Sequence, residues 1–455
     1  MFLKREFLLI IFLGFLISSI TSFLYLNKYD QINNHNVMIR GDIYFIWKEA
    51  EILKKDLHNG KNFFSSGTEY KRTYLPSKLL AIYSYLTGYE LFENFDEGKI
   101  KQGYGQLFYL IIQSLIYYLS LLFFYFKILI FFNFNKQKCF FILCFLALEP
   151  TIIQWHSSFW TESIFFSLQL ISLGLIIKKK KNIFHYLITG IFIGLLYLQK
   201  TTAMFYIFPV ILYFAISIKN KRTVSIVSFV FGYLFVILFL GYHNFKRSNI
   251  FYVIPKQSKV SHYHYLVPQV ISIKNNISES EIRRGQKKSE LKWIIENNIN
   301  LNSEKDRRQI YNYYQKYAFE VFLHNPLITA KIYIKKTIHH GLLNPVQIYF
   351  WYKYNNNDNG EQYHLNSDHK KWIWKRILYS LVIYFFILIG IFYSFKKREH
   401  KNFNYFIILS IFYYMFMLGW MGNTRYFMPS LILLSIFFGE GMFLVFQRFL
   451  RKNII

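Results

Sequence analysis

Long runs of apolar residues alternate with short clusters of charged residues along the chain. About ten of these runs approach the roughly 20 residues that an α-helix needs to cross a bilayer. We place the runs at 7–26, 107–132, 139–153, 159–177, 183–198, 203–218, 223–241, 377–395, 403–421 and 426–447. The pattern predicts an all-α polytopic membrane protein.

Two longer stretches interrupt the runs, and we call 27–106 the first long loop and 242–376 the second long loop. The chain then divides into a first transmembrane helix (1–26), the first long loop, transmembrane helices 2–7 (107–241), the second long loop, and transmembrane helices 8–10 with a tail (377–455). Within the second long loop, the apolar spacing predicts helices at 279–297 and 304–343, with turns or helix starts at Pro326 and Pro345.

The first long loop contains an amphipathic stretch that begins at Asp42. Apolar residues recur at helical spacing and charged residues lie on the other side, which predicts a helix along a membrane surface. The apolar set is Ile43, Ile46, Trp47, Ala50, Leu53 and Leu57, and the charged set is Lys48, Glu49, Lys54 and Lys55. Asp42 then has two interpretations: a catalytic base, or an N-cap that accepts a hydrogen bond from a backbone N–H.

Composition excludes an ordinary soluble protein. Of the 455 residues, 53% are hydrophobic and 21% are aromatic. The two cysteines, Cys139 and Cys144, lie in one apolar run, so we predict no disulfide, metal or redox role for them. Residues 1–26 resemble a signal peptide, but the many runs that follow indicate a membrane anchor that is retained.

Basic residues predict the orientation. The short connections on one side hold eighteen Lys and Arg residues, whereas those on the other side hold only Lys200 and Arg425. The eighteen are Lys4, Arg5, Lys136, Lys138, Lys178, Lys179, Lys180, Lys181, Lys219, Lys221, Arg222, Lys396, Lys397, Arg398, Lys401, Arg448, Arg451 and Lys452. The positive-inside rule therefore predicts cytoplasmic termini and outward-facing long loops.

The second long loop is strongly basic, with twenty-two basic and ten acidic residues, whereas the first has eleven and ten. A basic outer domain suits anionic lipid headgroups or a phosphorylated substrate. A solvated surface without a specific ligand explains the charge equally well.

Of the 25 acidic residues, twenty lie in the two long loops and Glu6 and Glu399 lie on the predicted cytoplasmic side, so only Glu149, Glu162 and Glu440 are left in or against the membrane. Ionisable groups at that depth are costly, so each is a candidate functional residue. Glu149 and Glu162 flank one outward connection, which also holds His156. Glu440 lies toward the cytoplasmic end of the last predicted span, where we expect a structural pairing with a basic residue.

Lys200 and Arg425 each lie at a span boundary on the outward face. The phosphate of a lipid carrier sits at about that depth, where a cation could hold it and stabilise the charge of a leaving group. Anchoring of the helix ends by snorkelling is the alternative interpretation.

Five stretches of the chain resemble, in the same order, the motifs of one known family of membrane proteins. They are GDIYFIWKEAEIL from Gly41, YLPSKLLAIYSYLTG from Tyr74, EPTIIQWHSSFWTES from Glu149, QKTTAMFYIFP from Gln199 and TRYFMPS from Thr424. The chain resembles the polytopic glycosyltransferases of the GT-C class, in particular bacterial relatives of protein O-mannosyltransferases and of the aminoarabinose transferase that acts on lipid A. It departs from them in having a single acid, Asp42, where two adjacent acids are common, and in having Lys200 and Thr201 where Arg-Pro is commoner.

The resemblance implies transfer of a sugar from a polyprenyl-phosphate donor to a glycan, lipid or protein acceptor on the outer face of a membrane, expected to be the bacterial inner membrane. It implies Asp42 as general base, Glu162 orienting the acceptor or the base, and Lys200 and Arg425 on the donor phosphate. Possible acceptor or sugar contacts are Tyr44, Glu149, His156 and Tyr426.

Other chemistries find less support in the residues. The pairs His339–His340 and His262–His264 lack a Cys or carboxylate partner at a recognised metal spacing, although a divalent cation stays possible. No Gly-rich phosphate loop follows a strand, which argues against a nucleotide-sugar donor, and we expect no nucleic-acid partner. An O-antigen-type polymerase and a lipid-linked glycan transporter remain as alternatives; the first needs catalytic residues in 242–376 and the second needs two related halves.

Overall fold

The computed structural model describes residues 5–30, 42–67, 74–89, 104–133, 135–157, 159, 161–178, 182–338, 367–397, 400–418 and 427–452. At 25–30, 42–44, 257–259, 367–376 and 450–452 the structure describes the backbone alone. All regular secondary structure within the described residues is helical, as predicted.

Five of the described helices are long and apolar enough to cross a membrane. They are α1 (Arg5–Asp30), α4 (Tyr104–Phe131), α10 (Arg222–Ser248), α16 (Ser367–Lys396) and α18 (Met428–Lys452). Each overlaps one of the predicted apolar runs. The chain is therefore an integral membrane protein with at least these candidate spans.

The other predicted spans are shorter or broken. The run at 139–153 forms α5 (Lys136–Leu148) and α6 (Pro150–His156), which meet at an angle of 49°. Glu149 between them has extended backbone angles and Pro150 lacks a backbone donor, so the helix cannot continue. The remaining runs form α7 (Glu162–Ile176), α8 (Ile183–Gln199), η3 (Thr201–Ala203) with α9 (Ile207–Ser217), and α17 (Lys401–Leu418). Ten spans therefore stay a prediction.

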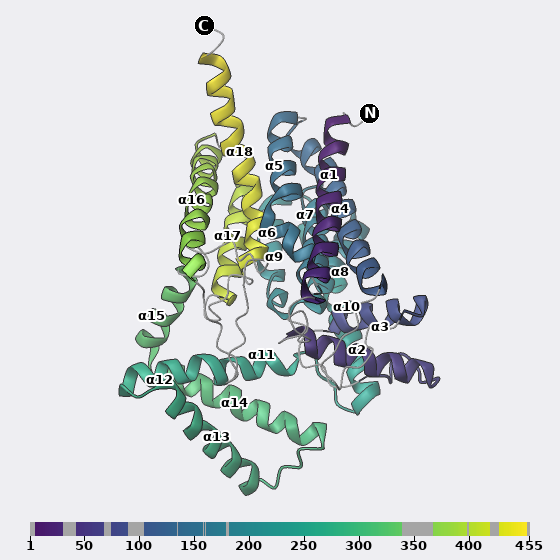
Figure 1. Ribbon diagram of the computed structural model, residues 1–455, viewed down its shortest axis with the longest axis vertical. Helices are drawn as coiled ribbons and strands as arrows, with labels where there is room; N and C mark the ends of the chain where they lie inside the picture. Colours follow the sequence, from purple (N-terminus) through teal and green to yellow (C-terminus); the bar gives the residue numbers. More distant parts are fainter. Residues whose placement is uncertain are drawn as a thin grey trace.

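Figure 1 shows both termini at one end of an upright helical bundle. The short helices that the structure describes in the two long loops gather mainly at the opposite end, which we call the distal end. The distal helices are α2 (Asp42–His58), α3 (Tyr74–Thr87), α11 (Lys256–Ser261), η4 (His262–Leu266), α12 (Val267–Asn275), α13 (Glu279–Glu296) and α14 (Glu304–His324), and α15 (Pro326–Thr337) leads back toward the bundle. The predicted placement of both termini on one side agrees with this arrangement; which side is cytoplasmic stays a prediction.

Close helix packing holds the bundle together. Gly190 of α8 lies against the backbone of Phe229 in α10, and Gly232 of α10 lies against the backbone of Leu187. In the same way, Gly390 of α16 faces the backbone of α18. Residues without a side chain let helix backbones approach in an apolar environment where packing, rather than hydrophobic burial, drives association.

The predicted amphipathic helix is confirmed as α2, but its surroundings differ from the prediction. Its apolar residues Ile46, Trp47, Ala50 and Leu53 are at most 1% exposed. They pack against α3, α4 and Phe159 in one hydrophobic cluster, so these residues face protein instead of a membrane. Glu49, expected on the polar side, is only 6% exposed, and that part of the prediction is wrong.

In the second long loop, the helix predicted at 279–297 is confirmed as α13. The helix predicted at 304–343 breaks at Asn325, because Pro326 starts a new helix, α15. Residues 339–343 lie outside the described residues, and α11, η4 and α12 had not been predicted. A small core of Tyr263, Ile299, Ile310, Tyr311 and Tyr314 joins η4 to α14, and a second cluster of Leu266, Val270 and Ile332 joins η4, α12 and α15.

Glu440 forms an ion pair with Lys138 in the first turn of α5. The pairing predicted for Glu440 is thus confirmed. Lys138 also lies over the ring of Phe132, with its ammonium 3.7 Å from the ring centre. Both charged side chains are nearly buried, at 8% and 12% exposure.

Candidate active site

Parts of four of the five sequence stretches meet one another in space. Trp47 of α2 packs edge-on against Phe159 of the connection between α6 and α7, with ring centres 5.0 Å apart. Tyr74 at the start of α3 belongs to a hydrophobic cluster against which Met204 of the fourth stretch packs, and Tyr74 and Thr201 line one pocket. Figure 1 places α2 and α3 at the distal end.

The fifth stretch touches the same group of helices through its described part. The amide of Gln169 in α7 donates to the carbonyl of Pro429 at 2.9 Å. Phe427 and Met428 of the fifth stretch share the main hydrophobic core with Trp155 of the third stretch and with Ala203 and Tyr206 of the fourth. The described parts of all five stretches therefore belong to one contiguous packing network.

Glu162 and Lys200 form a buried ion pair within this network. Glu162 Oε1 and Lys200 Nζ are 2.9 Å apart, and the side chains are 0% and 5% exposed. Glu162 begins α7 and Lys200 caps the C-terminus of α8, the two positions that helix dipoles favour for these charges. Gln199 adds a second link by donating to the carbonyl of Thr161 at 2.8 Å.

Glu149 serves as the N-cap of α6. Its Oε2 accepts from the backbone N–H of Ile152 at 2.8 Å, and its Oε1 accepts from the Thr151 hydroxyl at 2.8 Å. The hydroxyl of Tyr379 donates to Oε1 at 3.3 Å. The carboxylate is therefore directed into the protein.

His156 is also directed into the bundle. The residue is 0% exposed, and its Nδ1 lies 2.8 Å from the Ser163 hydroxyl. Its ring lies against that of Tyr117, with centres 3.8 Å apart. The carbonyl of His156 accepts from the amide of Gln113 at 2.8 Å, which fixes the end of α6 against α4.

The remaining predicted site residues have less structural description. Asp42 and Tyr44 lie in the first turn of α2, where the structure gives their helical backbone only. Arg425 and Tyr426 lie outside the described residues. Helix α2 lies at the distal end and packs on Phe159 of the Glu149–Glu162 connection, and Asp42 is its first residue.

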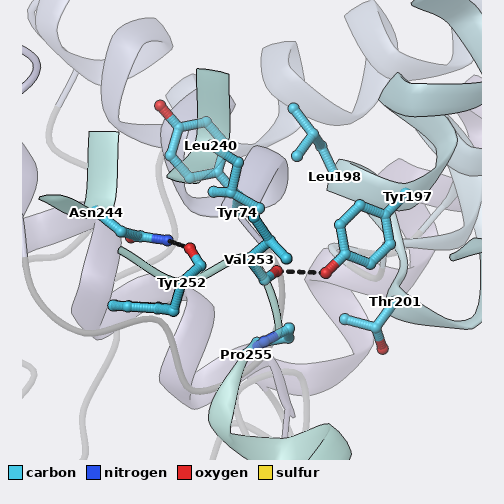
Figure 2. Close-up of a pocket in the computed structure, with 9 residues that line it drawn as sticks. All are labelled: Tyr74, Tyr197, Leu198, Thr201, Leu240, Asn244, Tyr252, Val253 and Pro255. Atoms are coloured by element: carbon cyan, nitrogen blue, oxygen red, sulfur yellow. Dashed lines mark hydrogen bonds between the residues drawn. The ribbon is translucent and has the colours of Figure 1, made fainter. Parts of the chain in front are cut away.

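A small pocket lies beside Lys200. Figure 2 shows Tyr74, Tyr197, Leu198, Thr201, Leu240, Asn244, Tyr252, Val253 and Pro255 around it. Its volume of about 20 Å³ is room for roughly one water molecule. The segment 252–255 forms one wall; the Asn244 amide donates to the Tyr252 carbonyl at 2.7 Å, and the Tyr197 hydroxyl donates to the Val253 carbonyl. The pocket combines aromatic faces with hydroxyl and amide groups.

Lys78 is a buried cation that the sequence analysis did not single out. It is 2% exposed, and its ammonium lies 4.4 Å from the centre of the Phe63 ring. Burial, together with the nearby positive charge of Arg247, lowers the pKa of Lys78 to about 7, although Asp56 and Glu49 oppose the shift. The available signal was its position four residues after Tyr74 in an otherwise apolar helix.

His243 belongs to the same region. It is 0% exposed, and its ring packs edge-on against Tyr74 with centres 5.0 Å apart. It lies one residue before Asn244, which lines the pocket. Nothing in its sequence surroundings distinguishes His243 from an ordinary residue at a helix end.

Within the described residues, no group of three or more His, Cys, Asp or Glu side chains is arranged to hold a metal ion. The pair His339–His340 lies outside them, and His262 and His264 lie in η4.

No protein-family model matches the chain, and no curated protein sequence matches it. Among solved structures, it is similar to the oligosaccharyltransferase AglB of the archaeon Archaeoglobus fulgidus in complex with an inhibitory peptide and a dolichol-phosphate, with a TM-score of 0.49 and 14% identity over 99% of this chain and 52% of that one. The Archaeoglobus fulgidus oligosaccharyltransferase tethered to an acceptor peptide gives a TM-score of 0.48 and 13% identity over 98% of this chain and 50% of that one. The chain thus spans about half the length of these proteins. Similarity at this level does not establish a function, which has to come from the site.

Proposed function

We propose that the protein is a membrane glycosyltransferase that moves a sugar from a polyprenyl-phosphate donor to a glycan, lipid or protein acceptor on the outer face of the membrane. The observation that carries the proposal is the meeting of the five sequence stretches in one packing network that includes the Glu162–Lys200 ion pair. Stretches from such distant parts of the chain need not meet if each only anchors its own helix.

In this proposal Asp42 is the general base. An acceptor hydroxyl loses its proton as its oxygen attacks the anomeric carbon, so a carboxylate has to lie within hydrogen-bond reach. Attack from the face opposite the departing phosphate inverts the anomeric centre. The N-terminal turn of α2 suits this role, because the helix is held against the rest of the site by its buried apolar face.

Lys200 and Arg425 bind the donor phosphate in this proposal. The phosphate leaves with negative charge, and cations placed where that charge develops lower the barrier. Lys200 is paired with Glu162 in the structure, so we assign that pair to the state before the donor binds. The phosphate then replaces the carboxylate as the partner of Lys200, and Glu162 turns to orient the acceptor or Asp42.

In this account, Tyr44 and Tyr426 contact the sugar or the acceptor directly. Glu149 and His156 already make hydrogen bonds inside the protein, so either one contacts a substrate only after those bonds open. The account also includes the predicted ten spans, cytoplasmic termini and an active site that faces outward from a bacterial inner membrane. It leaves the sugar and the need for a divalent cation open.

Deletion of the protein from its host, followed by analysis of surface glycans and extracted lipids, tests the proposal. We expect one sugar to disappear from the glycans and its polyprenyl-phosphate form to accumulate. Accumulation of a complete lipid-linked repeat unit would instead identify a polymerase. An unchanged glycan and lipid pool would overturn the proposal.

A further inference from the structure

One ion pair connects the start of α14 to the end of α10. Arg247 donates from Nη1 to Glu304 Oε2 and from Nη2 to Glu304 Oε1, both at 2.8 Å. The two side chains are 7% and 12% exposed. A two-pronged pair with so little solvent contact fixes both the distance and the angle between α10 and the first turn of α14.

The same groups hold Tyr252. Arg247 Nη2 donates to the Tyr252 hydroxyl at 2.5 Å, and the guanidinium carbon of Arg308 lies 3.1 Å from the centre of the Tyr252 ring. The Asn244 amide fixes the Tyr252 carbonyl from the other side. Tyr252 is therefore held by two side chains of α10 and one of α14.

Tyr252 forms part of one wall of the pocket in Figure 2, and the other walls belong to α3, α8, η3 and α10. Three tyrosines and two polar side chains face the pocket, a combination that suits the apolar faces and hydroxyl groups of a sugar ring. The polar residues are Thr201 and Asn244. A volume of about 20 Å³ admits no such ring until a wall moves.

We infer that Arg247 and Glu304 are positioning residues that set the place of Tyr252 in a pocket for the sugar ring of a lipid-linked donor. The wall 252–255 moves outward to admit the ring, and the ion pair returns Tyr252 against it. Helix α14 thereby acts on the pocket through Glu304. The identity of the ligand rests on the proposed function. The positioning of Tyr252 by Arg247 and Glu304 does not.

Hydrogen–deuterium exchange on the purified full-length protein tests the structural part. Arg247→Ala and Glu304→Gln each remove charge-assisted hydrogen bonds, so exchange of the backbone amides of 249–254 should rise roughly ten- to hundredfold. Arg283→Ala is the matched control, because Arg283 is in an exposed pair with Glu279 within the same loop. Unchanged exchange at 249–254 in both test variants would overturn the inference.

Arg247→Lys separates positioning from a general loss of folding. Lysine keeps the charge but lacks the planar fork, so exchange at 249–254 should lie between wild type and Arg247→Ala, while peptides from α8 and the middle of α10 stay unchanged. A variant that instead raises exchange throughout α8 and α10 would show that Arg247 maintains the fold and does not position Tyr252.

The ligand is tested with the lipid extract of the deletion strain as the probe. Added to wild-type protein, the extract should slow exchange at 249–254, and the same extract after mild acid hydrolysis of its glycosyl phosphates should not. Equal protection by both extracts would exclude the sugar as the occupant. Absence of a lipid-linked sugar from the extract would overturn the proposed function, and the Arg247 and Glu304 results would still decide the structural part.

Discussion

Lys200 Nζ lies 2.9 Å from Glu162 Oε1, although the two residues are 38 positions apart in the chain. Both side chains are buried, and they join the start of α7 to the end of α8. The pair can be a structural link, a resting state of a phosphate site, or both. Variants of the two residues separate these roles.

Lys200→Met should lower the stability of the protein by about 3–5 kcal/mol, because it leaves a buried carboxylate without its cation. The measurement is the thermal unfolding midpoint of the protein in detergent. The double variant Glu162→Gln/Lys200→Met removes both charges and should recover most of the loss. A Lys200→Met protein as stable as wild type would contradict the buried pairing.

Activity of the same double variant tests whether the pair acts in sugar transfer as well as in folding. If Lys200 binds the donor phosphate, the double variant stays defective in sugar transfer although its stability has recovered. Full complementation of the deletion strain by the double variant would leave Lys200 with a structural role alone.

Lys78 predicts a dependence of stability on pH. Its pKa in the folded protein is lowered to about 7, below its ordinary value of 10.5, so between those values the unfolded chain binds more protons. Stability should therefore rise with pH from about 7 to 10, by up to about 1.4 kcal/mol per pH unit, and stay independent of this group below pH 7. Lys78→Met should remove that rise. Parallel pH profiles of the unfolding midpoint in wild type and Lys78→Met would contradict the lowered pKa of Lys78.

Two glycines give a matched test of helix packing. A methyl group at Gly232 would meet the backbone of Leu187, so Gly232→Ala should force α8 and α10 apart and lower stability. Gly285 in α13 has no neighbour within 4 Å of such a methyl group, so Gly285→Ala should raise stability by about 1 kcal/mol through helix propensity. If both variants shift the unfolding midpoint in the same direction, the packing of α8 on α10 is contradicted.

Glu440→Gln separates a structural acid from a catalytic one. Loss of the Glu440–Lys138 ion pair should lower the unfolding midpoint, because Lys138 keeps a nearly buried charge without its partner. Complementation should be unaffected at the growth temperature, since the pair joins α5 to α18 and lies outside the candidate site. Loss of sugar transfer in a variant that is made and inserted at wild-type level would assign Glu440 a functional role.

Helix positions follow from local spacing, which is why the sequence predicts them well. The apolar period of the first long loop locates α2, and the longest apolar runs locate α1, α4 and α10. Spacing does not reveal what covers a helix. Glu49 is only 6% exposed and acts on the pKa of Lys78 in α3, a tertiary relationship that the spacing within α2 does not encode.

The candidate site was predictable where charge is rare. Glu162 and Lys200 stand out because few ionisable residues lie near the spans, but their pairing depends on how α7 packs against α8. Lys78 and Arg247 lie among the eleven and twenty-two basic residues of the two long loops. Only tertiary contacts distinguish them from the solvated cations around them.

Asp42→Asn in the deletion strain tests the central claim most directly. Glu51→Gln is the control, because Glu51 lies in the same helix and pairs with Lys55 at 2.8 Å on its surface. We predict that Glu51→Gln restores the glycan, whereas Asp42→Asn is made and inserted but slows transfer roughly 10²- to 10⁴-fold and accumulates the polyprenyl-phosphate sugar as the deletion does. Full restoration of the glycan by Asp42→Asn would contradict Asp42 as the general base.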